Sequence, residues 1–158
     1  TPCGAKKSSE PSTARTLYKS TRIRAVYARR RTRKMAILSA KFGLVDTELV
    51  IAPYDQQMDY ARAVELLPQV CEFIAARNHG CIVFFRGGTG EAYLNLMKEA
   101  ASAIGIPLVY FGFPNRDNLH VALLPEIIDL ATRSLFVPIQ MICPSAFIYS
   151  PRKELWMF

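Results

Sequence analysis

Cys81-Ile-Val-Phe-Phe85 and Pro107-Leu-Val-Tyr-Phe111 are two short apolar runs, separated by Arg86-Gly-Gly-Thr-Gly90 and a helical pattern that ends near Ile104. Apolar runs of this length, bounded by turn residues, are typical of strands buried on both faces. Strands joined through a helix pair in parallel, and such crossovers are right-handed. The order predicts an α/β fold, a Rossmann-like three-layer sandwich with a mostly parallel sheet and a ligand crevice at the carboxyl ends of its strands.

Other elements follow from similar patterns along the chain. We expect helices over 13–31, 59–78 and 119–133, a strand over 34–39 with its loop at 40–45, and an extended piece at 50–52. Pro68 should kink or split the second helix. The loops near 3–9, 39–44 and 86–90 share one sheet edge if a strand precedes Cys3. Since too few residues precede Cys3 for a full strand, that strand lies upstream or the first loop is anchored differently.

The chain has 158 residues, which suits one domain better than two. We predict a single α/β domain over 1–134. Residues 135–158 form an apolar carboxyl-terminal arm interrupted by three prolines. We expect this arm to add a strand to the sheet edge or otherwise pack on its own domain; the alternative is packing on a neighbouring subunit of a homo-oligomer.

Composition narrows the class of protein. No apolar run approaches the roughly 20 residues of a membrane helix, and the polar, basic start is unlike a signal peptide. We therefore expect a cytoplasmic protein without a membrane partner. The four cysteines include no Cys-x-x-Cys pair, and Cys71 and Cys81 fit buried thiols. Without a carboxylate cluster, the sequence predicts no metal site, and we assign no cofactor.

Positive charge is concentrated at the amino-terminal end. Residues 1–34 hold eleven Lys and Arg and one acid, a formal charge of +10, while the rest of the chain carries −3. One hypothesis is a nucleic-acid-binding helix face that uses Arg22, Arg29, Arg30 and Arg33. The other is a solvated basic face that maintains solubility. In both, Arg15 and these four arginines should be exposed, with Leu17, Ile23 or Val26 facing inward.

Two loops carry candidate reactive groups. Cys3 precedes Lys6 and Lys7, whose ammonium groups favour a reactive thiolate. The same lysines and the backbone N–H groups of the loop suit a phosphate, and Cys3 also fits a buried structural position. Ser39 and Lys41 lie in Ile37-Leu-Ser-Ala-Lys41 and are the other candidate catalytic groups.

The glycine-rich loop is the third candidate. Its residues Arg86, Gly87, Gly88, Thr89, Gly90 and Glu91 follow a strand and begin a helix. Glycines let a backbone approach a phosphate, and a helix N-terminus favours an anion. The loop is neither a Walker motif nor a dinucleotide fingerprint. A tight strand-to-helix turn without a ligand is the alternative.

Several motifs resemble a small domain of unknown function found in bacteria, archaea and phages. They are Cys3-Gly-x-Lys6-Lys7, Ala14-x-x-Leu17-Tyr18-x-Ser20, Ile37-Leu38-Ser39-Ala40-Lys41-x-Gly43-Leu44-Val45 and Ala52-Pro53-Tyr54, within about residues 1–112. Pro2-Cys3, Lys7 and Tyr18-x-Ser20 are also distantly similar to the lysine-transfer domain of archaeosine synthase. This second resemblance implies chemistry on a modified nucleobase.

The leading hypothesis is an enzyme that acts on a nucleotide or nucleic-acid base, as a nucleobase-modifying transferase or an N-glycosidase. Lys6, Lys7 and the 87–90 loop would hold a phosphate, with Cys3, Ser39 and Lys41 at the reacting end. One alternative is a non-catalytic nucleic-acid-binding module. Another is a nucleoside-monophosphate hydrolase of the lonely-guy type, which also uses a glycine-rich strand-to-helix turn.

Overall fold

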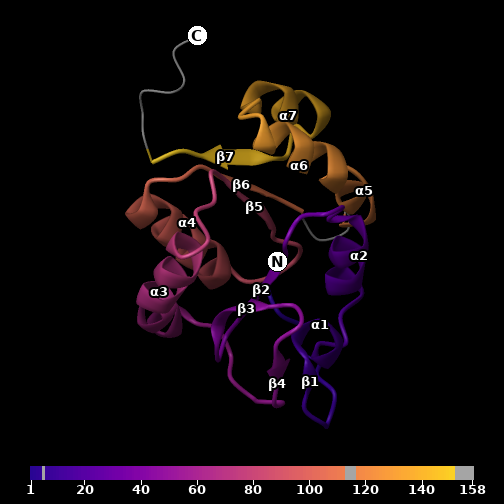
Figure 1. Ribbon diagram of the computed structural model, residues 1–158, viewed down its shortest axis with the longest axis vertical. Helices are drawn as coiled ribbons and strands as arrows, with labels where there is room; N and C mark the ends of the chain where they lie inside the picture. The colour runs from indigo at the N-terminus through magenta and orange to yellow at the C-terminus, as the bar shows by residue number, and fades with distance from the viewer. Residues whose placement is uncertain (5, 113–116, 152–158) are drawn as a thin grey trace.

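The structure, a computed structural model, describes residues 1–4, 6–112 and 117–151 (Figure 1). The strands are β1 (Ser12–Thr13), β2 (Ala36–Ser39), β3 (Gly43–Asp46), β4 (Val50–Ile51), β5 (Ile82–Phe85), β6 (Leu108–Phe111) and β7 (Phe147–Tyr149). The helices are α1 (Ala14–Leu17), α2 (Thr21–Arg29), α3 (Tyr60–Ala75), α4 (Glu91–Ile104), α5 (Asp117–Ala122), α6 (Leu124–Thr132) and α7 (Phe136–Ile142). The predicted α/β class is confirmed.

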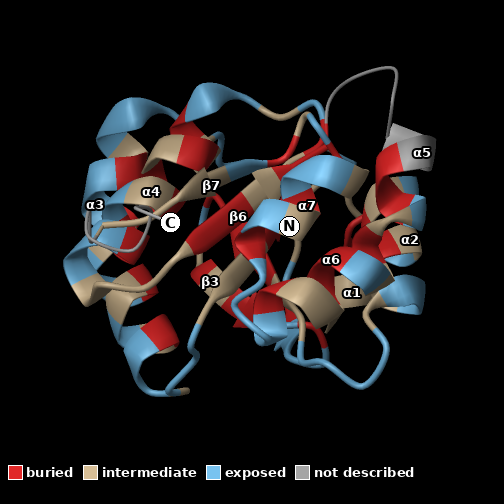
Figure 2. Ribbon diagram, turned by 90° about the horizontal axis from the view of Figure 1, so that it is seen from above, coloured by how far each residue is buried: buried red, intermediate tan, exposed pale blue. Residues whose placement is uncertain are grey.

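Strands β5 and β6 pair in parallel, as their apolar runs predict. Alternate side chains of the pair enter two different cores. Phe84 and Leu108 pack with residues of α3 and α4, whereas Phe85 and Phe111 pack with residues of α5, α6 and α7. Both faces of this pair are therefore covered, and Figure 2 shows β6 buried between helices.

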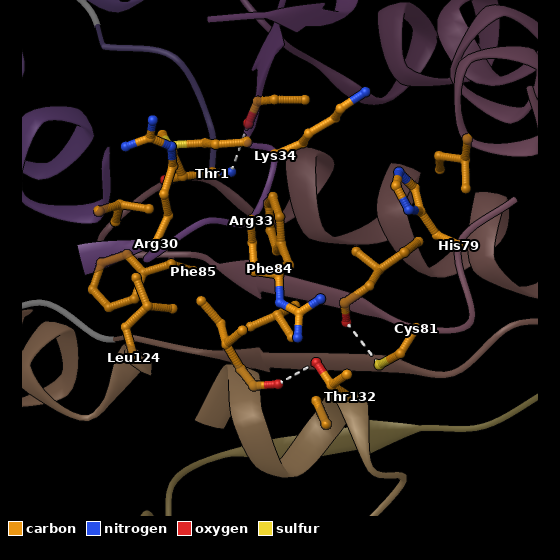
Figure 3. Close-up of a pocket in the computed structure, with 18 of the residues that line it drawn as sticks. Thr1, Arg30, Arg33, Lys34, His79, Cys81, Phe84, Phe85, Leu124 and Thr132 are labelled. Atoms are coloured by element: carbon orange, nitrogen blue, oxygen red, sulfur yellow. Dashed lines mark hydrogen bonds between the residues drawn. The ribbon is translucent and has the colours of Figure 1, made fainter. Parts of the chain in front are cut away.

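The predicted Rossmann-like sandwich with one mostly parallel sheet is not confirmed. The strands form three small sheets, β1–β4, β2–β3 and β5–β6–β7, and each ladder except β5–β6 is antiparallel. One reason is that β2 and β5 do not pair. A cavity of about 550 Å³ lies between them, lined by residues 34–36 and 81–85 among others, and Arg30 and Arg33 also line it (Figure 3).

The expected loop at 40–45 is largely wrong, because β2 turns back into an antiparallel hairpin with β3. Two local features favour this turn. The Ser39 hydroxyl accepts the backbone N–H groups of Lys41 and Phe42, both at 3.1 Å. Gly43 then adopts a φ of 64°, a conformation that costs glycine little. Three hydrogen bonds from α3 hold this turn in place: Arg62 binds the carbonyls of residues 40 and 41, and Gln69 that of Phe42.

Two of the predicted helices are each divided. The 13–31 helix is interrupted because Tyr18 is extended and pairs with Lys7, after which Ser20 caps α2. The 119–133 helix separates into α5 and α6, with Pro125 in the first turn of α6. In contrast, α3 runs through Pro68 without being split. None of the helices in the described part of the chain is long and apolar enough to span a membrane.

The carboxyl-terminal arm packs on its own chain. Strand β7 pairs antiparallel with the edge of β6 that β5 leaves free, which is one of the arrangements expected for the arm. Phe136, Ile139 and Cys143 join the core formed by β5, β6, α5 and α6. A homo-oligomer formed through the arm stays a prediction, and the end of the arm, 152–158, lies outside the described residues.

Candidate functional site

Cys3 is anchored beside β2. Its backbone N–H donates to the Leu38 carbonyl at 2.8 Å, and the Leu38 N–H donates to the Thr1 carbonyl at 2.9 Å. The first residues therefore run parallel to β2 and leave Cys3 next to the carboxyl end of that strand. Two of the three candidate loops, those of Cys3 and Ser39, meet here.

Ser39 is the start of a chain of hydroxyl groups. Its Oγ lies 2.7 Å from the Tyr54 hydroxyl, which lies 2.8 Å from the Tyr18 hydroxyl. A serine hydroxyl has two lone pairs and one proton. Since both lone pairs of Ser39 accept backbone N–H groups of the turn, its proton goes to Tyr54, and Tyr54 donates to Tyr18. Ser39 is fully buried and fully bonded, so it positions Tyr54.

Cys3 meets a second tyrosine. Its Sγ lies 3.2 Å from the hydroxyl of Tyr93, in the first turn of α4 and 90 residues away in sequence. Burial raises the pKa of Tyr93 and of Tyr54, and the negative charge of a Cys3 thiolate raises both further. Both hydroxyls therefore stay protonated at neutral pH. The Cys3 side of this site is enclosed, because Cys3 is 8 % exposed.

Two of the predicted cations lie over the Tyr54 ring. The Lys7 Nζ is 4.3 Å from the ring centroid and the Lys41 Nζ is 6.0 Å from it. Ammonium groups at these distances are attracted to an aromatic face. Lys41 is exposed and Lys7 half-buried, so both can also reach a ligand, whereas Lys6 is exposed on the surface.

Arg22 joins the first loop to the glycine-rich loop. Its Nη2 donates to the carbonyls of Pro2 and Cys3, at 3.3 and 3.2 Å. Gly87, with a φ of 61°, lies against the same side chain: a Cβ at this position would be 2.7 Å from the Arg22 Cδ. The structure thus places Arg22, predicted to bind nucleic acid at the surface, inside the site, where it is half-buried.

The rest of the glycine-rich loop makes its own contacts. Arg86 binds the Glu91 carboxylate, and the Thr89 hydroxyl donates to the Arg86 carbonyl at 3.0 Å. Gly88 and Gly90 are exposed, and Gly90 directly precedes the first turn of α4. A phosphate bound at this helix end would lie beside Glu91. The Glu91 carboxylate would repel it unless Arg86 stays paired with Glu91 and offsets its charge.

The remaining arginines of the predicted nucleic-acid face divide into two groups. Arg29 and Arg33 are exposed, as predicted. Arg30 is half-buried, because its guanidinium stacks 3.6 Å from the centroid of Tyr27, and Arg15 is half-buried as well. On the inner face Leu17, Ile23 and Val26 are all buried, which confirms that part of the prediction.

The structure corrects the prediction that Cys71 and Cys81 are buried: both are half-buried, whereas Cys3 and Cys143 are buried. Loss of hydration raises the pKa of Cys71, and it raises the pKa of Cys81 to about 11. Few thiolates form at these two positions at pH 7. They are therefore internal references for the reactivity of Cys3.

Sequence reasoning missed the roles of Tyr18, Tyr54, Tyr93 and Arg62. Tyr18 and Tyr54 lie within two of the quoted motifs, which was the available signal. In the described part of the chain, no group of three or more His, Cys, Asp or Glu residues is placed to hold a metal ion. The arrangement offers a thiol, protonated phenols and cations.

Comparison with known proteins adds one finding. Residues 1–115 match a family of unknown function, DUF6884. The chain belongs to this family. The DUF6884 match contains the whole hydroxyl network, Arg22 and the glycine-rich loop, but not α5, α6, α7 or β7. Neither the curated proteins nor the solved structures give a match to the chain.

Proposed function

We propose that this DUF6884 protein is an enzyme that acts on a nucleotide or a nucleic-acid base, as a nucleobase-modifying transferase or an N-glycosidase. One observation carries the proposal. A thiol, three tyrosine hydroxyls and two lysines from separate parts of the chain meet at the carboxyl end of β2 and the first turn of α4. A site made only for stability has no need of a buried thiol bonded to a protonated phenol, beside a second phenol whose ring lies under two lysines.

Cys3 is the nucleophile in this proposal. Its thiolate attacks an electrophilic carbon of the base or sugar, and the new C–S bond replaces the bond to the leaving group. Water, in hydrolysis, or an acceptor molecule, in transfer, then displaces the sulfur. Tyr93, which stays protonated and lies 3.2 Å from the sulfur, is placed to donate a hydrogen bond in this step.

The lysines supply the affinity for an anion. Lys7 and Lys41 at the Tyr54 ring, Lys6 at the surface and the 87–90 loop are the groups that would bind a phosphate. Ser39 acts through Tyr54, whose hydroxyl it orients. The distant similarity of the first-loop pattern to the lysine-transfer domain of archaeosine synthase supports a nucleobase as the substrate.

Alkylation of the cysteines tests this proposal. Iodoacetamide at pH 7 should label Cys3 faster than Cys71 and Cys81, whose thiolates are disfavoured, and mass spectrometry maps the sites. Nucleoside monophosphates at millimolar concentration should slow labelling of Cys3 only. Lys7→Gln should remove most of that protection, since it removes a charge-assisted phosphate contact.

Lys34→Gln is the matched control, because Lys34 is exposed and is not one of the site lysines. It should leave the protection unchanged. The proposal fails if Cys3 is no more reactive than a cysteine in a short peptide, or if no nucleotide protects it. Where a substrate is found, Cys3→Ser should abolish turnover and retain binding, because the sulfur acts in the transition state.

A further inference from the structure

A second concave surface lies between α1 and α2, next to the proposed site. It is a groove of about 500 Å³, and its lining includes three basic residues, Arg15, Lys19 and Arg24, and two aromatic ones, Tyr18 and Tyr27. Lys19 and Arg24 are exposed. These three basic residues lie in the basic amino-terminal segment but were not among the four arginines singled out to bind nucleic acid. We call this surface the α1–α2 groove.

Tyr18 belongs both to the groove and to the hydroxyl network. It is 1 % exposed, and its hydroxyl reaches Tyr54 at 2.8 Å. Its backbone pairs with Lys7, and the Lys19 N–H donates to the Lys6 carbonyl at 2.9 Å. Lys19 of the groove and the lysines of the first loop, Lys6 and Lys7, therefore lie on two paired segments.

The arginine side of the groove is ordered before any ligand binds. Glu48 accepts the Arg15 Nε–H at 3.0 Å and the Tyr27 hydroxyl proton at 3.0 Å. Arg15 and Arg30 also stack on Tyr27, at 5.2 and 3.6 Å from its centroid. Glu48 is the acid that faces Arg15 here, so Lys19 and Arg24 are the principal cations for an anionic partner.

We propose that the α1–α2 groove binds the phosphate backbone of a single-stranded nucleic acid whose target base enters the site at Cys3. This inference rests on the proposed function. A mononucleotide would use the lysines at Tyr54, whereas a strand supplies further phosphates for Lys19 and Arg24. Enzymes that act on a base take it out of the stack, which favours a strand with free bases over a duplex. A positively charged groove that follows the phosphate backbone is a usual means of holding one.

Fluorescence anisotropy with a labelled 12-nucleotide single strand, as RNA and as DNA, tests the groove. Lys19→Gln combined with Arg24→Gln should weaken binding at least tenfold and reduce the slope of log affinity against log salt by about 1 to 2. Lys34→Gln combined with Arg133→Gln removes the same charge from exposed positions outside the groove and should change affinity less than threefold. Equal effects of the two double variants, equal affinity for the duplex, or no binding at low salt overturns the inference.

Protection of Cys3 from alkylation separates this inference from the function on which it rests. If the strand is the substrate, the bound oligonucleotide slows Cys3 labelling, and the groove variant abolishes that effect. If nucleoside monophosphates protect Cys3 but the oligonucleotide does not, the proposed function is retained and the assignment of a polynucleotide as the substrate is rejected. If neither ligand protects Cys3, the proposed function fails, and with it the assignment of the strand as substrate.

Discussion

The protein buries two cysteines in two cores that differ in what surrounds the sulfur. In the amino-terminal core, which includes Cys3, Leu17, Tyr18 and Ile37, hydroxyl groups are buried with the apolar side chains. In the carboxyl-terminal core, which includes Phe111, Ile127 and Ile139, Cys143 lies 3.6 Å from Ser145, and Ser145 binds His120 at 3.1 Å. Both thiols thus have a hydroxyl partner.

The two cysteines differ in how far away in sequence their hydroxyl partners lie, and in whether cations lie near those partners. The partner of Cys143 is two residues away in sequence. The partner of Cys3 is 90 residues away, and the adjacent Tyr54 lies under two lysines. Bringing such distant polar groups together costs conformational entropy and desolvation that apolar packing does not require. Burial of a cysteine therefore does not by itself indicate its role. Convergence of distant polar groups and cations around it points to a chemical role.

The first test replaces one isoleucine in each core. Ile37 and Ile139 are both fully buried, so Ile37→Ala and Ile139→Ala should each lower the free energy of unfolding by about 2–5 kcal/mol. Urea unfolding measures this. Under conditions where both variants are folded, only Ile37→Ala should change the alkylation rate of Cys3, since Ile37 shares a core with Cys3. An equal change in Ile139→Ala would show that the two cores act as one unit.

The second test compares two glycines with left-handed backbone. Gly87 and Gly105 have φ values of 61° and 77°, so an alanine at either position should cost about 1–2 kcal/mol of folding stability. At Gly105 the added Cβ meets no atom within 4 Å, whereas at Gly87 it meets Arg22 at 2.7 Å. Gly87→Ala should therefore cost about 1 kcal/mol more, from the lost Arg22 bonds to the first loop. It should also alter Cys3 labelling, which Gly105→Ala should leave unchanged.

Part of this fold could be predicted from the sequence because some elements are decided locally. The runs that became β5 and β6, and the helix α4 between them, are apolar segments bounded by glycine or proline, and all three are in place. The break at Tyr18 was missed because it depends on pairing with Lys7 eleven residues earlier. The sequence did not show that β2 and β5 belong to different sheets, because the residues of an apolar strand do not indicate which other strand it will pair with.

The candidate site was predictable to a similar extent. Cys3, Ser39 and Lys41 were chosen as reactive residue types in loops, and Cys3 and Ser39 do lie together. Tyr54 and Tyr93 became part of the site through hydrogen bonds across 15 and 90 residues. Arg22 was assigned to the surface because charged residues are seldom buried. Its two backbone carbonyl partners, which offset the cost of burial, appear only in three dimensions.

The third test uses alkaline pH to probe the buried hydroxyls. Burial raises the pKa of Tyr54, whereas in the unfolded chain a tyrosine ionises near pH 10. The folded state therefore holds this proton more tightly, so the contribution to stability is complete below pH 10 and is lost as the pH rises above it. Between pH 9 and pH 11 the wild type should lose about 1 kcal/mol more than Tyr54→Phe, measured by urea unfolding. Tyr60→Phe, at a position 60 % exposed, is the control and should lose as much as the wild type.

The smallest effect should come from Tyr93→Phe, which retains the ring and removes the hydroxyl 3.2 Å from Cys3. Either group can donate while Cys3 is a thiol, but only Tyr93 can donate once it is a thiolate. The variant loses this donor to the charged sulfur, a change of about 0.5–1.5 kcal/mol. Labelling of Cys3 at pH 7 should therefore slow by about two- to tenfold, and Tyr110→Phe, in the β5–β6–β7 sheet, should leave it unchanged. Faster labelling in Tyr93→Phe would mean that Tyr93 shields the sulfur without stabilising its charge. The Cys3 environment would then resemble that of Cys143, and the contrast between the two cores would lose its chemical basis.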